Sequence, residues 1–457
     1  MRSNYLPRRR LRRGSTIAAA GLALAMIVAA CGGDDGDGEG TAEADEEPAA
    51  EEEPADDGED EGAGDDMAAG VDDGSTITMW TRAATEATVQ RLVDAYNESH
   101  ENQVDLTVIP TDEYLGRVGT AAGAADLPDL VSLDVVFVPQ FTTQGAFLDI
   151  TDRIGSLPFA DNIAPSHVDV GTVDGAQHTV PLTMDLSVLF YNKDLYEEAG
   201  LDPEQPPTTL EEFAEHARTV DELGDDIHGT HFGGNCGGCY VFTWWPSIWG
   251  DGHEVMNEDG TESYLAEPEA VAVYDVWKGL HEDDVTNPET PDEAGPTWTG
   301  FFPEGNIGVM PMPSTTLGLM PDSFETGVAP IVGVDGGEST FVGGDSIGVS
   351  ANSELPDQAW NFIAWTLSDE AQVEVMAANN EVVARTDLAS NEYSEQDERL
   401  VTINEVASVG RTPYALNFGQ TFNDPQGPWL PLVRNYVFGD GSTLEEDNEA
   451  VNASLQE

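Results

Sequence analysis

Residues 75 to 110 read STITMWTRAATEATVQRLVDAYNESHENQVDLTVIP, and this stretch decides the fold class. STITMW at its start and QVDLTVIP at its end alternate apolar and polar side chains, which predicts two strands. Between them, Val89, Leu92, Val93 and Tyr96 recur at the spacing of a helix face. The stretch therefore predicts a strand, a helix and a second strand.

The same order continues along the chain. DEYLGRVGTAAGAA at 112–125 predicts a second helix, and PDLVSLDVVFV at 128–138 predicts a third strand. This alternation is typical of a parallel α/β sheet, in which ligands bind beyond the C-terminal ends of the strands. Trp80, Asp112 and Asp134 fall at or just past the three predicted strand ends, so we treat them as candidate ligand contacts.

The chain is strongly acidic, with 87 Asp and Glu against 17 Lys and Arg in 457 residues. Residues 1–74 hold six of the basic residues and 20 of the acidic ones, so residues 75–457 carry 67 acids against 11 bases. Nucleic acid is excluded as a partner because phosphate binding requires clustered Lys and Arg. Such self-repulsion destabilises a compact state unless salt screens it, so we infer a salt-adapted protein.

The first 30 residues have the layout of an export signal. An arginine cluster between Arg8 and Arg13 precedes an apolar run from Ile17 to Ala30 that is too short for a membrane span. The run ends in VAAC, which resembles the lipobox of bacterial lipoproteins and implies that Cys31 is acylated. Ordinary signal cleavage beside an incidental cysteine is the alternative, and the arginines leave a twin-arginine route open.

A low-complexity segment follows the lipobox. Residues 31–74 contain 20 acidic residues and neither a basic nor an aromatic one. Such a segment cannot bury enough apolar area to offset its ordering entropy, and its like charges keep it extended. We interpret it as a disordered tether to a lipid anchor on the outer face of the cell membrane, with capture of cations by its carboxylates as the alternative.

About 380 residues remain, more than one hydrophobic core usually supports, so two domains are expected. Seven phrases from residue 80 onward occur in the order found in extracellular solute-binding proteins of sugar ABC importers, and the chain resembles that family over roughly residues 75–440. The phrases are WTRAAT, LPDLVSLDVVFVPQFTTQGAFLDIT, VPLTMDLSVLFYNKDLYEEAGL, PPTTLEEFAEHA, WWPSIWGDGHEV, GNIGVMPMP and FVGGDSIGVSANSELPDQAWNFIAWTLSDEAQ.

The resemblance implies a two-lobed α/β fold of the type II periplasmic-binding-protein kind, whose lobes close on a ligand about a three-segment hinge. By position, the first lobe comprises residues 75–183 plus 340–382, and the second comprises 187–337 plus 388–457. The implied function is capture of a sugar, most similar to the disaccharide binders of the maltose and trehalose type, and its delivery to importer permease subunits. We also expect the protein to be a monomer that has no cofactor and no enzymatic activity and is anchored by lipid outside the membrane.

The resemblance also implies ligand contacts at particular positions. Asp185 lies at the first expected crossing between the lobes, and Asp134 and the pair Gly344 and Asp345 match positions that line the cleft in relatives. Arg385 matches a basic residue near the last crossing. Relatives often have an apolar or aromatic residue in place of Asp345.

The same chemistry follows from what a sugar requires. A pyranose has a rim of hydroxyls and an apolar C–H face, so carboxylates and guanidinium groups suit its rim and flat aromatic rings suit its face. Tryptophans are the natural candidates for the aromatic walls, namely Trp80, Trp244, Trp245, Trp249 and Trp298. Trp360 and Trp365 lie in a helix-like run and are assigned to packing, and Trp277 and Trp429 are left open.

The segment GNCGGCYVFTWWPSIWGDGHE at 234–254 is interpreted as a glycine-rich loop that presents part of this wall. Outside the cytoplasm Cys236 and Cys239 are free to form a disulfide, which would fix the local path of the loop. His228 and His231 are spaced to complete a tetrahedral zinc site with the two cysteines, and this remains an alternative. A redox pair is a third possibility, although the pair is not expected to open a helix.

Two other classes of function stay open at this point. The many carboxylates make close pairs inevitable, so a carbohydrate-active enzyme is not excluded, although their abundance carries no signal. No HExxH motif or phosphate-binding glycine loop is present. A surface adhesin or structural lipoprotein would explain the anchor and tether without explaining the ordered family phrases.

The charge imbalance generates a first prediction. Raising NaCl from ~0.1 to ~2 M shortens the screening length from ~10 Å to a few ångströms, so the thermal midpoint of the purified chain should rise. Differential scanning fluorimetry in NaCl, with sucrose as a control for preferential exclusion, measures the effect. A midpoint that stays flat or falls over this range would contradict salt adaptation.

Overall fold

The computed structural model describes residues 67–457. The signal sequence, Cys31 and nearly all of the acidic tether therefore lie outside the described residues. Among the residues that are described, no helix combines the length and apolar content needed to cross a bilayer.

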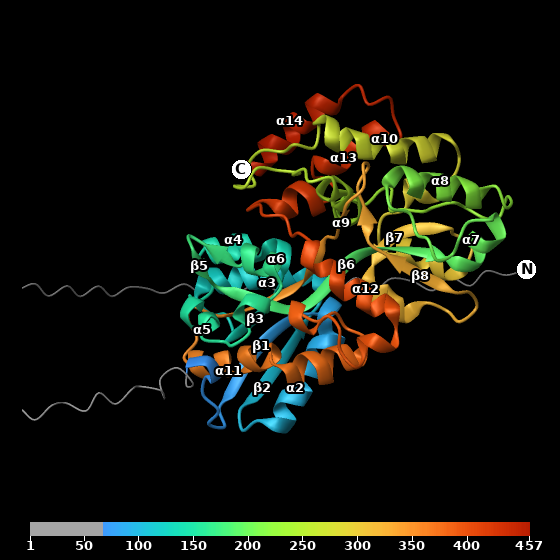
Figure 1. Cartoon of the computed structure of the whole chain (residues 1–457). Helices are drawn as coiled ribbons and strands as arrows, with labels where there is room; N and C mark the ends of the chain where they lie inside the picture. Colours follow the sequence, from blue (N-terminus) through green and yellow to red (C-terminus); the bar gives the residue numbers. More distant parts are fainter. Residues whose placement is uncertain (1–66) are drawn as a thin grey trace, which may run out of the picture. The chain divides into compact units, whose positions relative to one another are not determined.

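A seven-stranded sheet organises the structure, with the strand order β2-β1-β3-β11-β6-β7 and with β8 also paired to β6 (Figure 1). Strands β1 to β3 are parallel, as the sequence predicts, whereas β11 is antiparallel to both β3 and β6. The strands are β1 (Thr76–Arg82), β2 (Gln103–Ile109), β3 (Leu130–Asp134), β6 (Thr179–Asn192), β7 (Val309–Pro313), β8 (Thr326–Ala329) and β11 (Val342–Val349).

The connections of the parallel part are the two predicted helices, α2 (Glu86–Ser99) and α3 (Thr111–Ala124). The four apolar residues at helical spacing in α2 are its buried face. They pack with α11 (Pro356–Thr366) on one side of the sheet, while α3 and α4 (Val138–Thr143) cover the other (Figure 1). The prediction of alternating strands and helices is thus confirmed.

Strand β6 is fourteen residues long and exchanges partners at its centre. Its first half pairs with β11 as far as Leu186, and its second half pairs with β7 from Ser187 onward and with β8. Its side chains are buried along nearly the whole length, which explains the continuous apolar run in the sequence. One strand therefore belongs to both halves of the sheet.

The remaining helices and short strands surround these two halves. They are α5 (Thr151–Gly155), α6 (Pro165–Val170), α7 (Lys193–Ala199), α8 (Leu210–Asp221), α9 (Gly237–Gly250), α10 (Pro268–Glu282), α12 (Glu398–Val406), α13 (Trp429–Val437) and α14 (Leu444–Leu455), with β4 (Thr172–Val173), β5 (Ala176–Gln177), β9 (Ile331–Val332) and β10 (Glu338–Ser339). Helices α8, α9, α10 and α13 share one aromatic-rich core.

The predicted loop at 234–254 is wrong, because most of it forms helix α9. Cys236 caps the helix, its Sγ accepting a hydrogen bond from the Cys239 amide at 3.1 Å. The interior of α9 is apolar all round, so the helix is buried on most faces and shows little amphipathic periodicity. Glycines at its start and Pro246 within it concealed the helix in the sequence.

The predicted tether is also too long at its C-terminal end. Asn102 is fully buried, and its Oδ1 accepts hydrogen bonds from the amides of Asp73, Gly74 and Ser75, each at 3.1 Å. The indole of Trp360 donates to the carbonyl of Ala68 at 3.1 Å. Residues 68–74 are therefore packed on the folded part, and the prediction of disorder is wrong for them.

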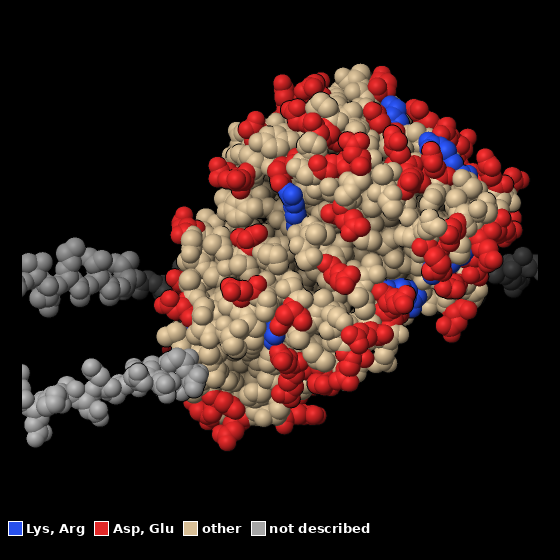
Figure 2. All heavy atoms as spheres, in the orientation of Figure 1, with Lys and Arg blue, Asp and Glu red and all other residues tan. Residues whose placement is uncertain are grey.

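Asp and Glu side chains are scattered in many groups over the visible face of the molecule, and Lys and Arg are few (Figure 2). Eleven ion pairs link described residues, and most involve exposed or half-exposed groups. Such pairs contribute ~0–1 kcal/mol each. They leave most surface carboxylates uncompensated, in keeping with the charge imbalance of the sequence.

Gly344 generates a prediction about the fold. It has φ +105°, and a Cβ there would lie 2.1 Å from the carbonyl oxygen of Thr183, so Gly344→Ala should destabilise the protein by at least ~2 kcal/mol in urea unfolding. Gly116→Ala is the matched control, because a Cβ at this exposed position in α3 meets nothing within 4 Å. The control should stabilise by up to ~1 kcal/mol, and equal effects of the two changes would contradict the strand geometry.

Candidate functional site

Three strand ends bring one arginine and two carboxylates together. Arg82 ends β1, and its Nη1 lies 2.7 Å from Asp134 Oδ2 at the end of β3. Its Nη2 and Nε lie 2.5 and 2.8 Å from Oδ1 of Asp345, on β11. Asp134 and Asp345 are directly opposed in the strand register, so Arg82 neutralises a pair of carboxylates that would otherwise repel each other.

Asp345 is a structural member of this cluster. Its side chain is fully buried, and its Oδ2 accepts hydrogen bonds from Ser132 Oγ at 2.7 Å and Thr85 Oγ1 at 3.1 Å, while Oδ1 binds Arg82. Because both oxygens are already engaged, Asp345 is not available to a ligand, contrary to the prediction. Gly344 likewise serves backbone geometry, since Thr183 leaves no room for a side chain.

Asp134 retains solvent contact. Its side chain is 26% exposed, and its Oδ1 accepts only a long 3.3 Å hydrogen bond from the Val136 amide. Desolvation raises the pKa of Asp134, although Arg82 opposes the shift. The structure thus leaves one oxygen of this carboxylate weakly engaged.

Asp185 lies on β6 one residue before Leu186, where β6 exchanges partners. Burial raises the pKa of Asp185 to about 6, opposed by weak hydrogen bonds from the Thr315 amide at 3.5 Å and Ser314 Oγ at 3.4 Å. A carboxylate held in this way is poorly solvated and has few protein donors. It can accept further hydrogen bonds from a polar ligand.

A cavity of about 950 Å³ lies beside Trp249. Three segments line it: residues 169–174 from the end of α6 through β4, residues 249–264 from the end of α9, and residues 411–414. Trp249 stacks on Phe341 with ring centroids 6.2 Å apart and is only 4% exposed. Of the five predicted wall tryptophans, Trp249 is the one that lines this cavity.

The other tryptophans of α9 are packing residues. Trp244 and Trp245 are both 0% exposed, and Trp244 stacks on Trp277 at 5.0 Å with an interplanar angle of 8°. Trp298 is 7% exposed and belongs to the apolar core. The prediction that these three side chains form a ligand wall is wrong, because neighbouring side chains already cover their faces.

Two further candidates lie elsewhere on β1 and α3. Strand β1 continues to Arg82, so Trp80 lies within the strand and carries the guanidinium of Arg117 at 4.9 Å from its ring. Asp112 is exposed in the first turn of α3. Neither residue lines the cavity beside Trp249, and the same holds for Asp134 and Asp185.

Arg385 is committed to local partners. Its guanidinium lies 2.5 Å from both Asp369 and Asp387, and it covers the ring of Phe159 at 4.0 Å. Only 4% of the residue is exposed. The predicted ligand contact is therefore contradicted by a complete set of protein partners.

Cys236 and Cys239 form the expected disulfide, which confirms that prediction. The zinc alternative is wrong because both sulfur atoms are bonded to each other. Burial lowers the pKa of His231 to about 4, and its Nδ1 is 2.8 Å from Thr290 Oγ1. Within residues 67–457, no group of His, Cys, Asp and Glu is arranged to hold a metal ion.

Arg82 and His167 were not among the candidates predicted from the sequence. Arg82 could have been found from its position directly after the first predicted strand. His167 on α6 is fully buried, and neither ring nitrogen has a hydrogen-bond partner. Burial lowers the pKa of His167 to about 4, so it is neutral near pH 7.

Residues 344–348, GDSIG, match the G-x-S-x-G spacing of hydrolase nucleophiles. That motif requires a sharp turn between a strand and a helix, with the serine exposed at the turn. Ser346 instead lies within β11, paired on both sides and fully buried. The motif here is a strand segment and not a nucleophile elbow.

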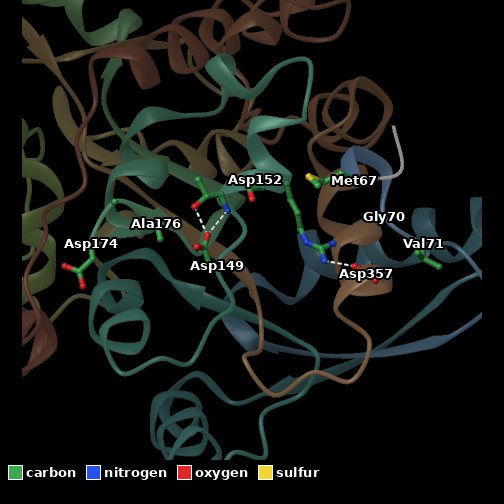
Figure 3. Close-up of a pocket in the computed structure, with 11 residues that line it drawn as sticks. Met67, Gly70, Val71, Asp149, Asp152, Asp174, Ala176 and Asp357 are labelled. Atoms are coloured by element: carbon green, nitrogen blue, oxygen red, sulfur yellow. Dashed lines mark hydrogen bonds and ion pairs between the residues drawn. The ribbon is translucent and has the colours of Figure 1, made fainter. Parts of the chain in front are cut away.

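A second cavity, of about 840 Å³, lies where residues 67–71 meet the body of the chain (Figure 3). Some of its polar groups pair with each other: Asp149 accepts from the Thr151 amide and hydroxyl at 2.9 and 2.6 Å, and Arg153 lies 2.5 Å from Asp357. Asp152 and Asp174, which also line it, are exposed carboxylates.

Comparison with known proteins gives a family and a fold. The family profile described as bacterial extracellular solute-binding protein matches residues 80–373. A Brucella abortus protein named as a binding protein is 26% identical over 264 residues, which cover 57% of this chain but only 63% of the relative. The diacetylchitobiose binding protein DasA of Streptomyces coelicolor is 26% identical over 389 residues, covering 82% of this chain and 83% of the relative.

Among solved structures, the sugar-binding protein MalE from Xanthomonas citri matches with a TM-score of 0.73 at 18% identity, covering 84% of this chain and 96% of that one. At this level of identity the match concerns the fold alone. It confirms the expected two-lobed periplasmic-binding-protein-like fold.

Asp185 generates a prediction about pH. Its pKa is raised in the folded state, so between its unfolded value of ~3.9 and about 6 the folded state binds more protons, and its contribution to stability is lost as pH rises. Asp185→Asn should therefore raise the thermal midpoint more at pH ~7.5 than at pH ~4.5. The control Asp112→Asn removes the same charge from an exposed position and measures the effect of charge removal alone. Parallel midpoint-against-pH curves for wild type and Asp185→Asn would contradict the assignment.

Proposed function

We propose that this chain, which belongs to the bacterial extracellular solute-binding protein family, captures a sugar between its two lobes and delivers it to an ABC importer. The observation that carries the proposal is the cavity beside Trp249. Its lining comes from residues 169–174, which fall in the expected first lobe, and from residues 249–264 and 411–414, which fall in the second. The name of DasA, a diacetylchitobiose binding protein, is consistent with a sugar ligand here.

The partner exchange in β6 supports the proposed division into lobes at residues 75–183 plus 340–382 and 187–337 plus 388–457. Ser187 begins the second half of β6, and its amide donates to the Phe341 carbonyl at 3.3 Å while its Oγ accepts from the Phe341 amide at 2.9 Å. These hydrogen bonds join the chain near Ser187 to the chain near Phe341, which are the first two segments expected to cross between the lobes. Rotation about such a narrow joint would open and close the cavity.

The side chains divide between the two faces of a sugar. Trp249 would contact the apolar C–H face with the part of its ring that lines the cavity. Asp134 and Asp185 lie outside the lining of this cavity, and their weakly engaged carboxylates would accept hydrogen bonds from hydroxyls of a sugar that extends beyond it. Arg82 would hold Asp134 in place and donate its remaining N–H groups. Binding of this kind needs no bond-making chemistry, so we propose a receptor and not an enzyme.

Export and anchoring complete the proposal. Cleavage before Cys31, acylation of its sulfur and the acidic segment that follows would hold the receptor outside the membrane on a tether. Residues 68–74 pack against α11 and Asn102, so the tether would join the first lobe at that point. We propose that the receptor acts as a monomer beside the permease subunits.

Ligand binding gives the deciding measurement. A panel of neutral mono- and oligosaccharides is tested by thermal shift and small-angle scattering, and the cognate sugar at a hundred times its Kd should stabilise the chain by ~2.7 kcal/mol, a rise of roughly 5–10 °C. It should also reduce the radius of gyration. Asp185→Ala should abolish most of the shift and Trp249→Ala should weaken it, whereas Asp112→Ala, at an exposed position away from the cavity, should retain it.

Failure of every sugar to move either the midpoint or the radius would reject the receptor proposal and favour the adhesin. Recovery of cleaved sugar after incubation would favour an enzyme.

A further inference from the structure

The walls of the cavity beside Trp249 are strongly anionic. Of the ionisable side chains that line it, five are carboxylates and one is a guanidinium. The carboxylates are Asp169, Asp174, Glu254, Glu258 and Asp259, all of them exposed. They come from both the 169–174 segment and the 249–264 segment, so they approach the cavity from two sides.

The single cation of this lining is not available to a ligand. Arg411 forms an ion pair with Glu254, which leaves four carboxylates of the lining without a cationic partner there. Outside this lining, at the strand ends, the positive charge of Arg82 is offset by Asp134 and Asp345, although two of its N–H groups remain free to donate. An anionic sugar entering this region would therefore meet uncompensated negative charge and no free guanidinium or ammonium group among the residues lining the cavity.

Aromatic rings add a second attraction for positive charge. Trp249, Tyr264 and Tyr414 line the same cavity, and the faces of such rings attract ammonium groups. The acidic exterior shown in Figure 2 faces bulk solvent, where its field is screened. The carboxylates of the cavity are exposed to solvent too, but they face one ligand from two sides, so their fields add at the ligand.

We propose that the cavity selects sugars that carry a protonated amine over their neutral parents and excludes uronic acids and sugar phosphates. The inference rests on the proposed function, since it takes this cavity as the sugar site. The ammonium group would lie among Asp169, Asp174, Glu258 and Asp259, and the ring of the sugar would lie against Trp249.

The test compares sugars that differ in one substituent. Glucose, glucosamine and glucuronic acid form one set, and cellobiose, fully deacetylated chitobiose and cellobiouronic acid form another. Titration calorimetry at about pH 6 keeps the carboxylates ionised and the amine protonated. The amine-bearing member should bind roughly tenfold or more tightly than its neutral parent at ~0.1 M NaCl, and this ratio should shrink at ~1 M NaCl.

A paired variant locates the effect. Glu258→Gln with Asp259→Asn should reduce the ratio of amine to neutral affinity severalfold. The control Glu98→Gln with Asp126→Asn removes the same charge from exposed positions at α2 and beyond α3, and it should leave the ratio unchanged.

Three results would overturn the inference: no amine-bearing sugar binds better than its neutral parent, an acidic sugar binds best, or the cavity variant behaves like the control. If neutral sugars still bind and shift the thermal midpoint in those cases, the receptor function stands and only the charge selectivity is rejected.

Discussion

The guanidinium of Arg82 neutralises two carboxylates that strand pairing places directly opposite each other. Without it, the register of β3 and β11 would bring Asp134 against the fully buried Asp345, and a buried unpaired charge costs several kcal/mol. That register is what carries β11 between β3 and β6, and hence what connects the parallel strands to the strand shared by both lobes. The positive φ of Gly344 belongs to the same constraint, because β11 passes too close to Thr183 there to carry a side chain.

Asp185 shows the opposite balance of charge and burial. It is on the shared strand, its pKa is raised to about 6 by burial, and its protein partners lie at 3.4 and 3.5 Å. At neutral pH the folded chain therefore holds an ionised group that its own structure solvates poorly. Groups of this kind are typical of binding sites, where a ligand supplies the missing hydrogen bonds and the empty protein is less stable than it could be. The charge of Arg82 is thus paired within the protein and stabilises the strand register, whereas the carboxylate of Asp185 lacks close protein donors and is free to accept hydrogen bonds from a ligand.

Most of the fold prediction depends on the local periodicity of apolar residues. Most of the features that the sequence did not predict depend on contacts between residues far apart in the chain. The alternation in β1 and β2 and the helical spacing in α2 are properties of short windows, so they can be read directly. Arg82 and Asp345 are 263 residues apart, and no local pattern indicates that they meet. The family resemblance implies that Arg385 contacts the ligand, but Asp387, only two residues away, already binds its guanidinium. The tryptophans of α9 were misread because a helix that is apolar on every face has no amphipathic signal.

Helix α9 also changes how the disulfide should be understood. The bond between Cys236 and Cys239 closes the first turn of the helix, whereas Trp249 lies thirteen residues later, about 20 Å away at 1.5 Å per residue. A four-residue ring at one end cannot fix the position of a side chain at the other. The packing between them can, because Trp244 and Trp245 are held by Trp277, Phe422 and Trp429 along the buried length of the helix. Trp245 in turn contacts Trp249 edge to face, with ring centroids 6.1 Å apart, so the buried tryptophans of α9 hold Trp249 in position beside the cavity.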